Sequence, residues 1–107
     1  MSRKVAENWL HAFQQKDISL VALAEGFTHS SPFGVVEGRD TYLNMVRANE
    51  AAFFDVELEV QDIITEGDKI AIRYLLNGNP ACDCIYIEGD QIAHIHSYYH
   101  IGEKPSL

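Results

Sequence analysis

The stretch DCIYIEGDQIAHIHSYY, residues 83–99, predicts two antiparallel strands joined by a tight turn. Apolar and polar residues alternate on both sides of Gly89-Asp90, and short alternating runs around such a pair are typical of a β-hairpin. A three-residue loop pairs Asp83 with Ser97, and it separates apolar from polar side chains better than a two-residue turn does. We therefore favour that register, with the two-residue Gly-Asp turn as the alternative.

In the favoured register, the two faces of this hairpin carry different side chains. One face holds a lone carboxyl among aliphatic residues, and we expect it to point towards the core and a pocket. That face consists of Asp83, Ile85, Ile87, Ala93, Ile95, Ser97 and Tyr99. The opposite face, which we expect to lie outside, consists of Cys82, Cys84, Tyr86, Ile92, His94, His96 and Tyr98.

Two cysteines and two histidines on the outer face raise the question of a zinc site. A nearly flat sheet spreads alternate side chains too far apart for tetrahedral ligation, so we expect no metal at Cys82, Cys84, His94 and His96. Next-but-one residues on a strand lie roughly 6.5 to 7 Å apart, which is also too far for an unstrained disulfide. We expect free thiols.

Amphipathic side chains gather on the same outer face, at Tyr86, His94, His96 and Tyr98. Aromatic residues are enriched at protein interfaces, and such a patch would be unusually large on a monomer. We therefore predict a homodimer that forms through this face.

Before the hairpin, the chain alternates with period two from Phe54 onwards. Turn residues stand at positions 66–68 and again at positions 77–80, so two further strands precede the last two. We predict that residues 54–100 are mainly antiparallel strand.

The first half of the chain has helical periodicity instead, and three helices are predicted there. The first ends near residue 16, the second covers 17–27 and the third covers 40–53, with Asp17 and Asp40 as N-caps. The buried stripe of the third helix is Tyr42, Met45, Val46, Asn49 and Phe53. Helices followed by a meander of strands predict an α+β domain, with the helices packed against one face of an antiparallel sheet.

The composition is that of one soluble globular domain spanning residues 1–107. The net charge of −8 argues against nucleic acid and anionic membranes as partners, because phosphate contacts need a basic patch. No apolar segment has the length of a membrane span or the pattern of a signal peptide, so we expect a cytoplasmic protein.

The segment FTHSSPFG, residues 27–34, places a histidine and two serines between two aromatic residues. If it is extended, His29 and Ser31 lie on one face and can line a pocket. A histidine with a pKa near 6.5 can serve as general acid or base, whereas a neutral serine hydroxyl cannot take a proton unaided. The alternative is that these residues satisfy backbone groups around a turn before Pro32.

Three motifs together resemble the nuclear transport factor 2-like superfamily, which includes ketosteroid isomerases and SnoaL-like polyketide cyclases. They are ENWLHAFQQKD at 7–17, HSSPFGVVEGRD at 29–40 and the closing hairpin at 83–99, and the resemblance covers nearly the whole chain. It implies a strongly curved sheet wrapped around helices, as a cone-like α+β barrel with one internal pocket. The outer face of such a sheet often forms a dimer.

The resemblance also implies roles for single residues. Asp83 matches the position at which the isomerases have a protonated carboxyl that donates to the substrate oxygen. Trp9 stands where they have a tyrosine, and Ser31 stands where they have the basic aspartate, which speaks against ordinary steroid isomerase activity. Burial among isoleucines would keep Asp83 neutral and able to donate, and the alternative is a carboxyl that reaches water or pairs with Arg73. The candidate catalytic groups are Asp83 and His29, and the expected pocket residues are Trp9, Ser31, Phe33, Phe54, Ile95, Ser97 and Tyr99.

Three functions are open at this point. The first is an isomerase, cyclase, dehydratase or hydrolase that acts on a small apolar carbonyl compound. The second is a non-catalytic domain that binds such a molecule, and the third is a dimerisation module with a vestigial pocket. None of these requires a cofactor, and we expect none.

Overall fold

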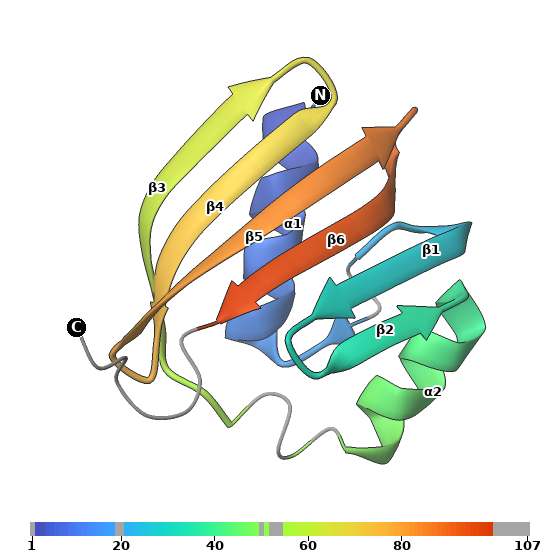
Figure 1. The fold of residues 1–107 in the computed structure, drawn as a ribbon, viewed down its shortest axis with the longest axis horizontal. Coiled ribbons are helices and arrows are strands. Elements are labelled where there is room, and N and C mark those ends of the chain that lie inside the picture. The colour runs from blue at the N-terminus through green and yellow to red at the C-terminus, as the bar shows by residue number, and fades with distance from the viewer. Residues whose placement is uncertain (1, 19–20, 50, 52–54, 100–107) are drawn as a thin grey trace.

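The computed structural model describes residues 2–18, 21–49, 51 and 55–99. The elements, in chain order, are α1 (Ser2–Gln15), β1 (Leu23–Ser31), β2 (Gly34–Glu37), α2 (Arg39–Ala48), β3 (Leu58–Glu66), β4 (Lys69–Leu76), β5 (Asn79–Glu88) and β6 (Gln91–Tyr99). The strands form one open sheet in the order β2-β1-β6-β5-β4-β3 (Figure 1). Neighbouring strands are antiparallel, except that β1 runs parallel to β6. The predicted α+β class is confirmed, and the sheet is mixed rather than purely antiparallel.

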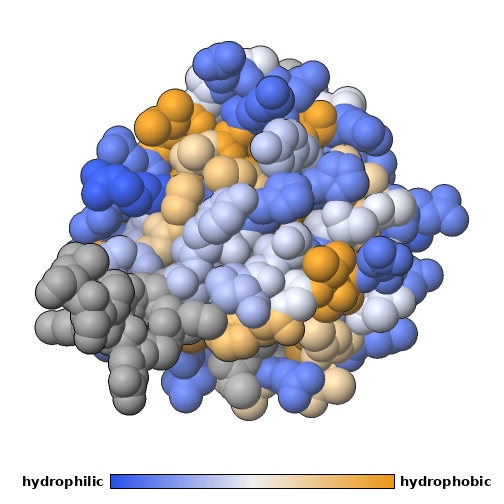
Figure 2. Space-filling model, viewed as in Figure 1, coloured by the Kyte–Doolittle hydropathy of each residue, from blue (hydrophilic) through white to orange (hydrophobic). Residues whose placement is uncertain are grey.

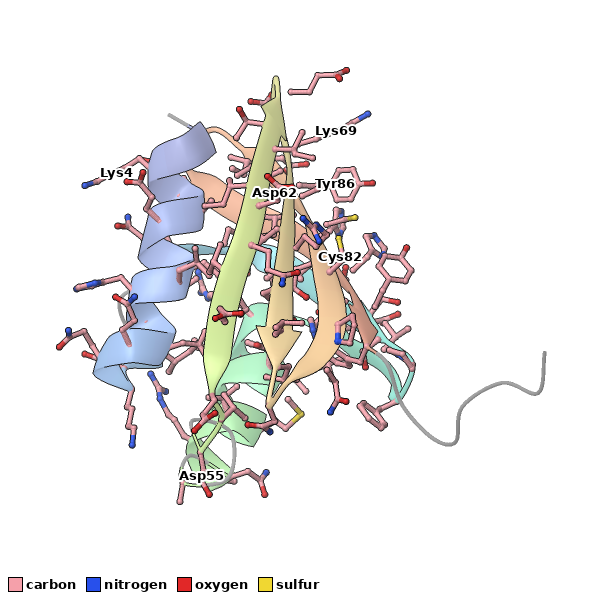
Figure 3. The ribbon with its side chains drawn as sticks, turned by 90° about the vertical axis from the view of Figure 1, so that its left-hand side faces the viewer. Lys4, Asp55, Asp62, Lys69, Cys82 and Tyr86 are labelled. Atoms are coloured by element: carbon pink, nitrogen blue, oxygen red, sulfur yellow. The ribbon has the colours of Figure 1, made fainter. Side chains whose placement is uncertain are left out.

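Both described helices lie on one side of the sheet. In Figure 1, α1 passes behind β4, β5 and β6, while α2 lies beside the β1–β2 hairpin. The view turned by 90° shows the opposite side of the sheet without a covering helix (Figure 3). The core fills the space between the two helices and the sheet, and its largest fully buried side chains are Tyr42, Phe27, Ile70, Ile72, Ile85, Ile92, Ile95 and Val46.

The first predicted helix is confirmed, since α1 ends at Gln15. Lys16 follows with φ of 55°, and its N–H donates to the carbonyl of Phe13 at 3.3 Å. The N–H of Asp17 donates to the carbonyl of Ala12 at 2.9 Å, which completes the pair of bonds that closes a helix through a left-handed residue. Asp17 therefore lies at the end of the first helix.

The second predicted helix is wrong, because residues 23–31 form strand β1. The residues that repeat at helical spacing here are Ile18, Val21, Ala24 and Phe27. Ile18, Val21 and Phe27 are indeed buried, but Ile18 and Val21 precede β1, so the buried residues belong to two segments and not to one helix. The first half of the chain is therefore less helical than predicted.

The third predicted helix is confirmed as α2, with changed ends. Gly38 occupies the N-cap position with φ of 94° and no side-chain cap, so Asp40 lies within the first turn and is not the cap. The helix ends at Ala48, and Phe53 lies outside the described residues. Of the predicted buried stripe, Tyr42 and Val46 are buried, whereas Met45 and Asn49 are exposed.

The four antiparallel strands β3 to β6 are confirmed, and so are the turns that connect β3 to β4 and β4 to β5. The first of these strands begins at Leu58, and Phe54 lies outside the described residues. Asp83 pairs with Ser97, as the favoured register predicts. The loop that we favoured is nevertheless wrong, because Glu88 pairs with Gln91 across a two-residue turn.

A register shift reconciles the two-residue turn with the predicted pairing. It lies between the pairs Tyr86–His94 and Ile87–Ile92, so Ala93 is the extra residue on β6. Because of this bulge, Ile92 is fully buried instead of lying on the outer face. The remaining side chains keep the predicted alternation.

Candidate functional site

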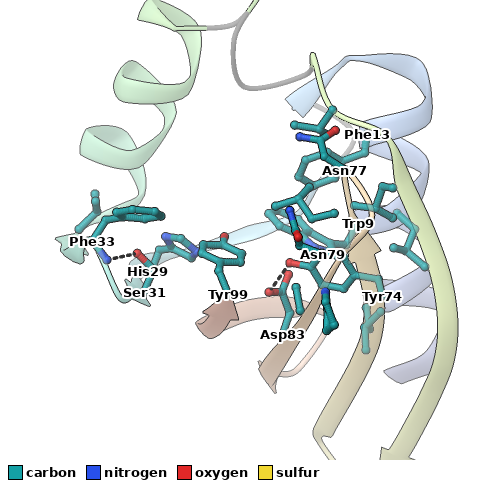
Figure 4. Close-up of a pocket in the computed structure, with 18 of the residues that line it drawn as sticks. Trp9, Phe13, His29, Ser31, Phe33, Tyr74, Asn77, Asn79, Asp83 and Tyr99 are labelled. Atoms are coloured by element: carbon teal, nitrogen blue, oxygen red, sulfur yellow. Dashed lines mark hydrogen bonds between the residues drawn. The ribbon is translucent and has the colours of Figure 1, made fainter. Parts of the chain in front are cut away.

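A cavity of about 570 Å³ lies between α1, α2, the β1–β2 hairpin and the inner face of the sheet (Figure 4). Its size is within the range of small-molecule sites in proteins. Most of its wall is aliphatic or aromatic, and the polar groups come from a few residues on different elements. Such a cavity suits an apolar molecule with a small number of polar atoms.

The structure brings six of the residues predicted for the site to this cavity. They are Trp9, His29, Ser31, Phe33, Asp83 and Tyr99. Ile95 and Ser97 were predicted to line the pocket, but they are buried behind its wall and do not line it. Phe54 lies outside the described residues.

Asp83 is the buried carboxyl of the site. It projects from β5, and only 4% of the residue is exposed. The hydroxyl of Tyr74 donates to its Oδ1 at 2.9 Å (Figure 4). Burial raises the pKa of Asp83, while hydrogen bonds from Ser97, Tyr74 and Trp9 act in the opposite direction. Burial is the largest of these influences, and it favours the neutral acid.

The alternative partner for Asp83 is absent from this side of the sheet. Arg73 lies on the outer face, where its guanidinium forms an ion pair with Asp62 at 3.1 Å. It also donates to the side chain of Gln61 at 3.1 Å. Asp83 therefore does not pair with Arg73, and that guanidinium does not act against the raised pKa of the carboxyl.

His29 projects from β1 towards the same cavity. Its Nε2 lies 3.0 Å from the hydroxyl of Ser97, and its ring centre is 5.4 Å from that of Tyr42. Burial lowers the pKa of His29, and the nearby charge of His96 lowers it further. Both effects favour the neutral imidazole, which can accept a proton at one ring nitrogen and donate from the other.

Tyr74 is a residue of the site that the sequence reasoning missed. It is almost fully buried on β4, and its hydroxyl holds the Asp83 carboxyl. Burial raises the pKa of Tyr74, and the charge of Asp83 raises it further, so the group stays a phenol that donates. The alternation of Ile70, Ile72 and Tyr74 predicted its face, but its contact depends on how β4 pairs with β5.

Ser31, at the tip of the β1–β2 hairpin, both lines the pocket and stabilises the turn. Ser31 lines the cavity, and its hydroxyl accepts the backbone N–H of Phe33 at 3.1 Å, as a turn residue would. Phe33 lies at the rim, where it is 75% exposed and its ring centre is 6.0 Å from that of Tyr99. A hydroxyl already used in the turn is poorly suited to act as a base.

The outer face of the sheet carries the second group of polar residues singled out from the sequence. Figure 3 shows Cys82 and Tyr86 projecting away from α1, and Figure 2 shows that this face is of intermediate hydropathy across its centre. The ring of Tyr86 meets that of His96 edge-on at 5.5 Å. We call Tyr86, His94, His96 and Tyr98 the outer-face patch.

Neither metal binding nor thiol chemistry is evident on this face. Among the described residues, no three His, Cys, Asp or Glu side chains are arranged to hold a metal ion. Cys82 and Cys84 are free thiols. Burial raises the pKa of Cys82, with Cys84 adding to the effect, so its thiol is a poor nucleophile near neutral pH.

Neither described helix has the length and apolar content that a membrane span requires.

Solved structures share this arrangement of helices and strands. A SnoaL-like protein of unknown function from Burkholderia thailandensis has a TM-score of 0.80 and 20% identity, over 92% of this chain and 93% of that one. An NTF2-like protein of unknown function from Cytophaga hutchinsonii has a TM-score of 0.77 and 22% identity, over 94% and 90%. A hypothetical protein with a ketosteroid isomerase-like fold from Catenulispora acidiphila, in complex with trimethylamine, has a TM-score of 0.75 and 16% identity, over 92% and 87%. At these identities the likeness establishes the fold alone.

A family model matches most of the chain. No curated protein matches the chain at a significant level. The family model of the SnoaL-like domain matches residues 6–97, which extend from α1 to β6. The chain therefore belongs to the SnoaL-like domain family.

Proposed function

We propose that this domain binds a small, largely apolar molecule through a carbonyl or enol oxygen, and that Asp83 donates a hydrogen bond to this oxygen. The observation that carries the proposal is a buried carboxyl on the wall of an otherwise mainly apolar cavity. A neutral acid in such a place stabilises charge that develops on oxygen, because the surroundings cannot screen it. Tyr74 supports this role by holding the other carboxyl oxygen.

The proposed reaction class is proton transfer next to that carbonyl, as in an isomerisation, cyclisation, dehydration or hydrolysis. His29 lines the same cavity and is the one imidazole on its wall among the described residues. The lowered pKa of His29 keeps it neutral and ready to accept a proton. His29 would thus take the place of the missing base at Ser31.

A non-catalytic binding domain is the second candidate. The hydroxyl of Ser31 is engaged by the N–H of Phe33, and Trp9 replaces the tyrosine of the isomerases, so two family groups are unable to play their usual parts. In that case Asp83 would still hold a carbonyl ligand, and no proton would move. The two candidates differ only in what happens to the bound molecule.

We also propose that the domain forms a homodimer through the outer-face patch. Tyr98 is 60% exposed and Tyr86 is 36% exposed. Tyr86 projects away from α1 (Figure 3), and Tyr98 pairs with Cys82 on the same face of the sheet. Covering these rings with a second copy would remove apolar surface from water. A cytoplasmic location suits the free thiols Cys82 and Cys84 beside the patch, and fractionation of the source cells would test it.

Two bicyclic probes test the proposed ligand chemistry. 1-Indanone has a carbonyl, and indane has nearly the same shape without one. Trp9 is the single tryptophan and lines the cavity, so its fluorescence reports binding of either probe. We expect Asp83→Leu to weaken binding of indanone by about 1–3 kcal/mol, the cost of one lost buried hydrogen bond, and to leave indane binding unchanged. Asp83→Asn, which still donates, should bind indanone more tightly than Asp83→Leu does.

The proposal is wrong if both probes bind wild type equally well, or if Asp83→Leu weakens their binding to the same extent. Exchange of the indanone α-protons in D₂O separates the two candidates. Acceleration by wild type, lost in His29→Gln, supports proton transfer. Tight binding of indanone without acceleration supports the non-catalytic domain.

A further inference from the structure

Ser97 lies between the two candidate groups of the cavity and does not itself line it. We propose that Ser97 is a positioning residue that accepts the Nε2–H of His29 and donates to Asp83, and so leaves Nδ1 of His29 as the basic nitrogen. This inference rests on the proposed function, because it concerns the same acid and base. It assigns to Ser97 a part that neither its burial nor its sequence position suggests.

The strand pairing places Ser97 between the other two residues. It is directly opposite Asp83 across the β5–β6 ladder. On the other side, β1 runs parallel to β6, and His29 is opposite Ile95, two residues before Ser97 and therefore on the same face. The order β1-β6-β5 thus sets histidine, serine and aspartate in a row along the inner face.

The hydroxyl of Ser97 has three candidate partners, His29, Asp83 and Tyr99. It is 3% exposed, so water does not supply its hydrogen bonds freely. It offers one proton and two acceptor lone pairs, and His29 Nε2 lies 3.0 Å away. If the hydroxyl donates to Asp83, its oxygen must accept from Nε2–H, and the neutral imidazole then carries its lone pair on Nδ1.

The opposite direction of donation is the competing arrangement. Asp83 would donate its proton to Ser97, and Ser97 would donate to His29 Nε2. That arrangement uses the Asp83 proton inside the protein and leaves none for a ligand oxygen. The first direction is the one that fits the proposed function, because it leaves the proton of Asp83 for a ligand oxygen.

The proposed direction leaves an acid and a base facing one ligand. Nδ1 of His29 takes a proton from the carbon next to the carbonyl, and the electron pair of the broken C–H bond moves into an enolate. The enolate oxygen accepts the hydrogen bond from Asp83. Ser97 keeps both of its bonds throughout, since the Nε2–H is present in neutral and in charged imidazole.

Other titratable groups surround the row and are shared by both arrangements. Tyr74 on β4 donates to Asp83, and Tyr99 on β6 interacts with Ser97, with Tyr74 and with the charge of Asp83. His96 acts on His29 through its charge, and the ring of Tyr42 lies against the imidazole from α2. All four groups are present in wild type and in the Ser97 variants, so a change in both titrations on substitution of Ser97 reports the loss of its hydroxyl.

The test is an NMR study of the ligand-free protein, labelled with ¹⁵N at histidine and with ¹³C at the aspartate carboxyl carbons. His29→Gln and Asp83→Asn assign the two signals. We expect the neutral imidazole of His29 in wild type to carry its proton on Nε2. In Ser97→Ala, we expect the pKa of Asp83 to rise and the pKa of His29 to fall, because the charged form of each group loses a hydrogen bond.

The control variants are Ser97→Thr, which keeps the hydroxyl, and Ser30→Ala, which removes a half-buried serine beside His29 on the outer face. Both should leave the two titrations as in wild type. A proton on Nδ1 in wild type overturns the inference, and so do unchanged titrations or shifts of the opposite sign in Ser97→Ala. Preferential binding of indanone would then still stand, so failure of this inference is distinguishable from failure of the proposed function.

Discussion

The β5–β6 hairpin carries polar side chains on both faces, but those on the inner face are buried and those on the outer face are largely exposed. On the inner face, Asp83 and Ser97 are almost fully buried, and each has hydrogen-bond partners. On the outer face, Tyr98 is 60% exposed, and Cys82 and Cys84 are only partly buried. A buried polar group is tolerated only when it is bonded, so its partners restrict its chemistry. An exposed group has no such restriction and is available to another molecule.

The largest expected difference between the faces is in packing. Ile85 is fully buried and its neighbour Tyr86 is on the outer face. We expect Ile85→Ala to lower the free energy of unfolding by about 2–5 kcal/mol, and Tyr86→Ala to lower it by about 1 kcal/mol or less. Urea unfolding followed by Trp9 fluorescence, at a protein concentration low enough to favour the monomer, measures both. Equal losses would mean that the outer face is packed as tightly as the core.

The second test concerns the partner of the outer-face patch. We expect Tyr98→Glu to raise the dissociation constant of the proposed dimer at least about tenfold, because a buried charge would replace an aromatic contact. Met45→Glu is the control, since Met45 is an apolar residue on the helical side that is 38% exposed. Sedimentation velocity over a concentration series measures both variants. A wild-type protein that is monomeric at micromolar concentration would exclude the dimer.

The third test uses the pH dependence of stability on the inner face. The folded state raises the pKa of Asp83 through burial, so it keeps a proton that the unfolded chain releases above a pH of about 3.9. Stability from this group is therefore lost as the pH rises towards its folded pKa. Asp83→Asn does not titrate, so its free energy of unfolding relative to wild type should increase with pH above about 4 and then level off.

Urea titrations at a series of pH values measure this difference. Asp90→Asn is the matched control, because Asp90 lies in the exposed turn of the same hairpin. A relative stability of Asp83→Asn that stays constant or decreases with rising pH would mean that the carboxyl is charged in the folded protein. The donor role of Asp83 would then be lost as well.

The smallest effect is expected at the rim, where the two environments meet. Phe33 lines the cavity but is 75% exposed. We expect Phe33→Ala to change the free energy of unfolding by no more than about 0.5 kcal/mol. Thermal denaturation with calorimetric detection gives the value. A loss above 1 kcal/mol would show that the contact with Tyr99 holds the hairpin in place.

The accuracy of the sequence predictions follows from how local each feature is. The helix α1 was predictable because its buried residues repeat within one element. The inner and outer faces of β5 and β6 were predictable because apolar residues segregate there. The loop was not, since the bulge at Ala93 is a property of paired strands. The segment around the start of β1 looked helical because Ile18, Val21, Ala24 and Phe27 follow one another at a spacing of three, although Ile18 and Val21 precede the strand.

Only the part of the candidate site that depends on local sequence patterns was predictable. Asp83 and His29 could be placed on the cavity side from alternation and from the family resemblance. Tyr74 was missed because its contact with Asp83 requires the register of β4 against β5. Ser97 was expected as a wall residue, and the parallel pairing of β1 with β6 instead puts it between the two candidate groups.

The parallel pairing of β1 with β6 also affects the order in which the chain can fold. The two strands are joined by α2 and by four other strands, so their pairing closes a long loop and carries the corresponding entropic cost. As the chain leaves the ribosome, β1 has its β2 partner long before β6 has been synthesised. The edge of β1 therefore stays open to pairing with other chains during synthesis. Closure of this edge comes last, and it is the same step that brings His29 next to Ser97.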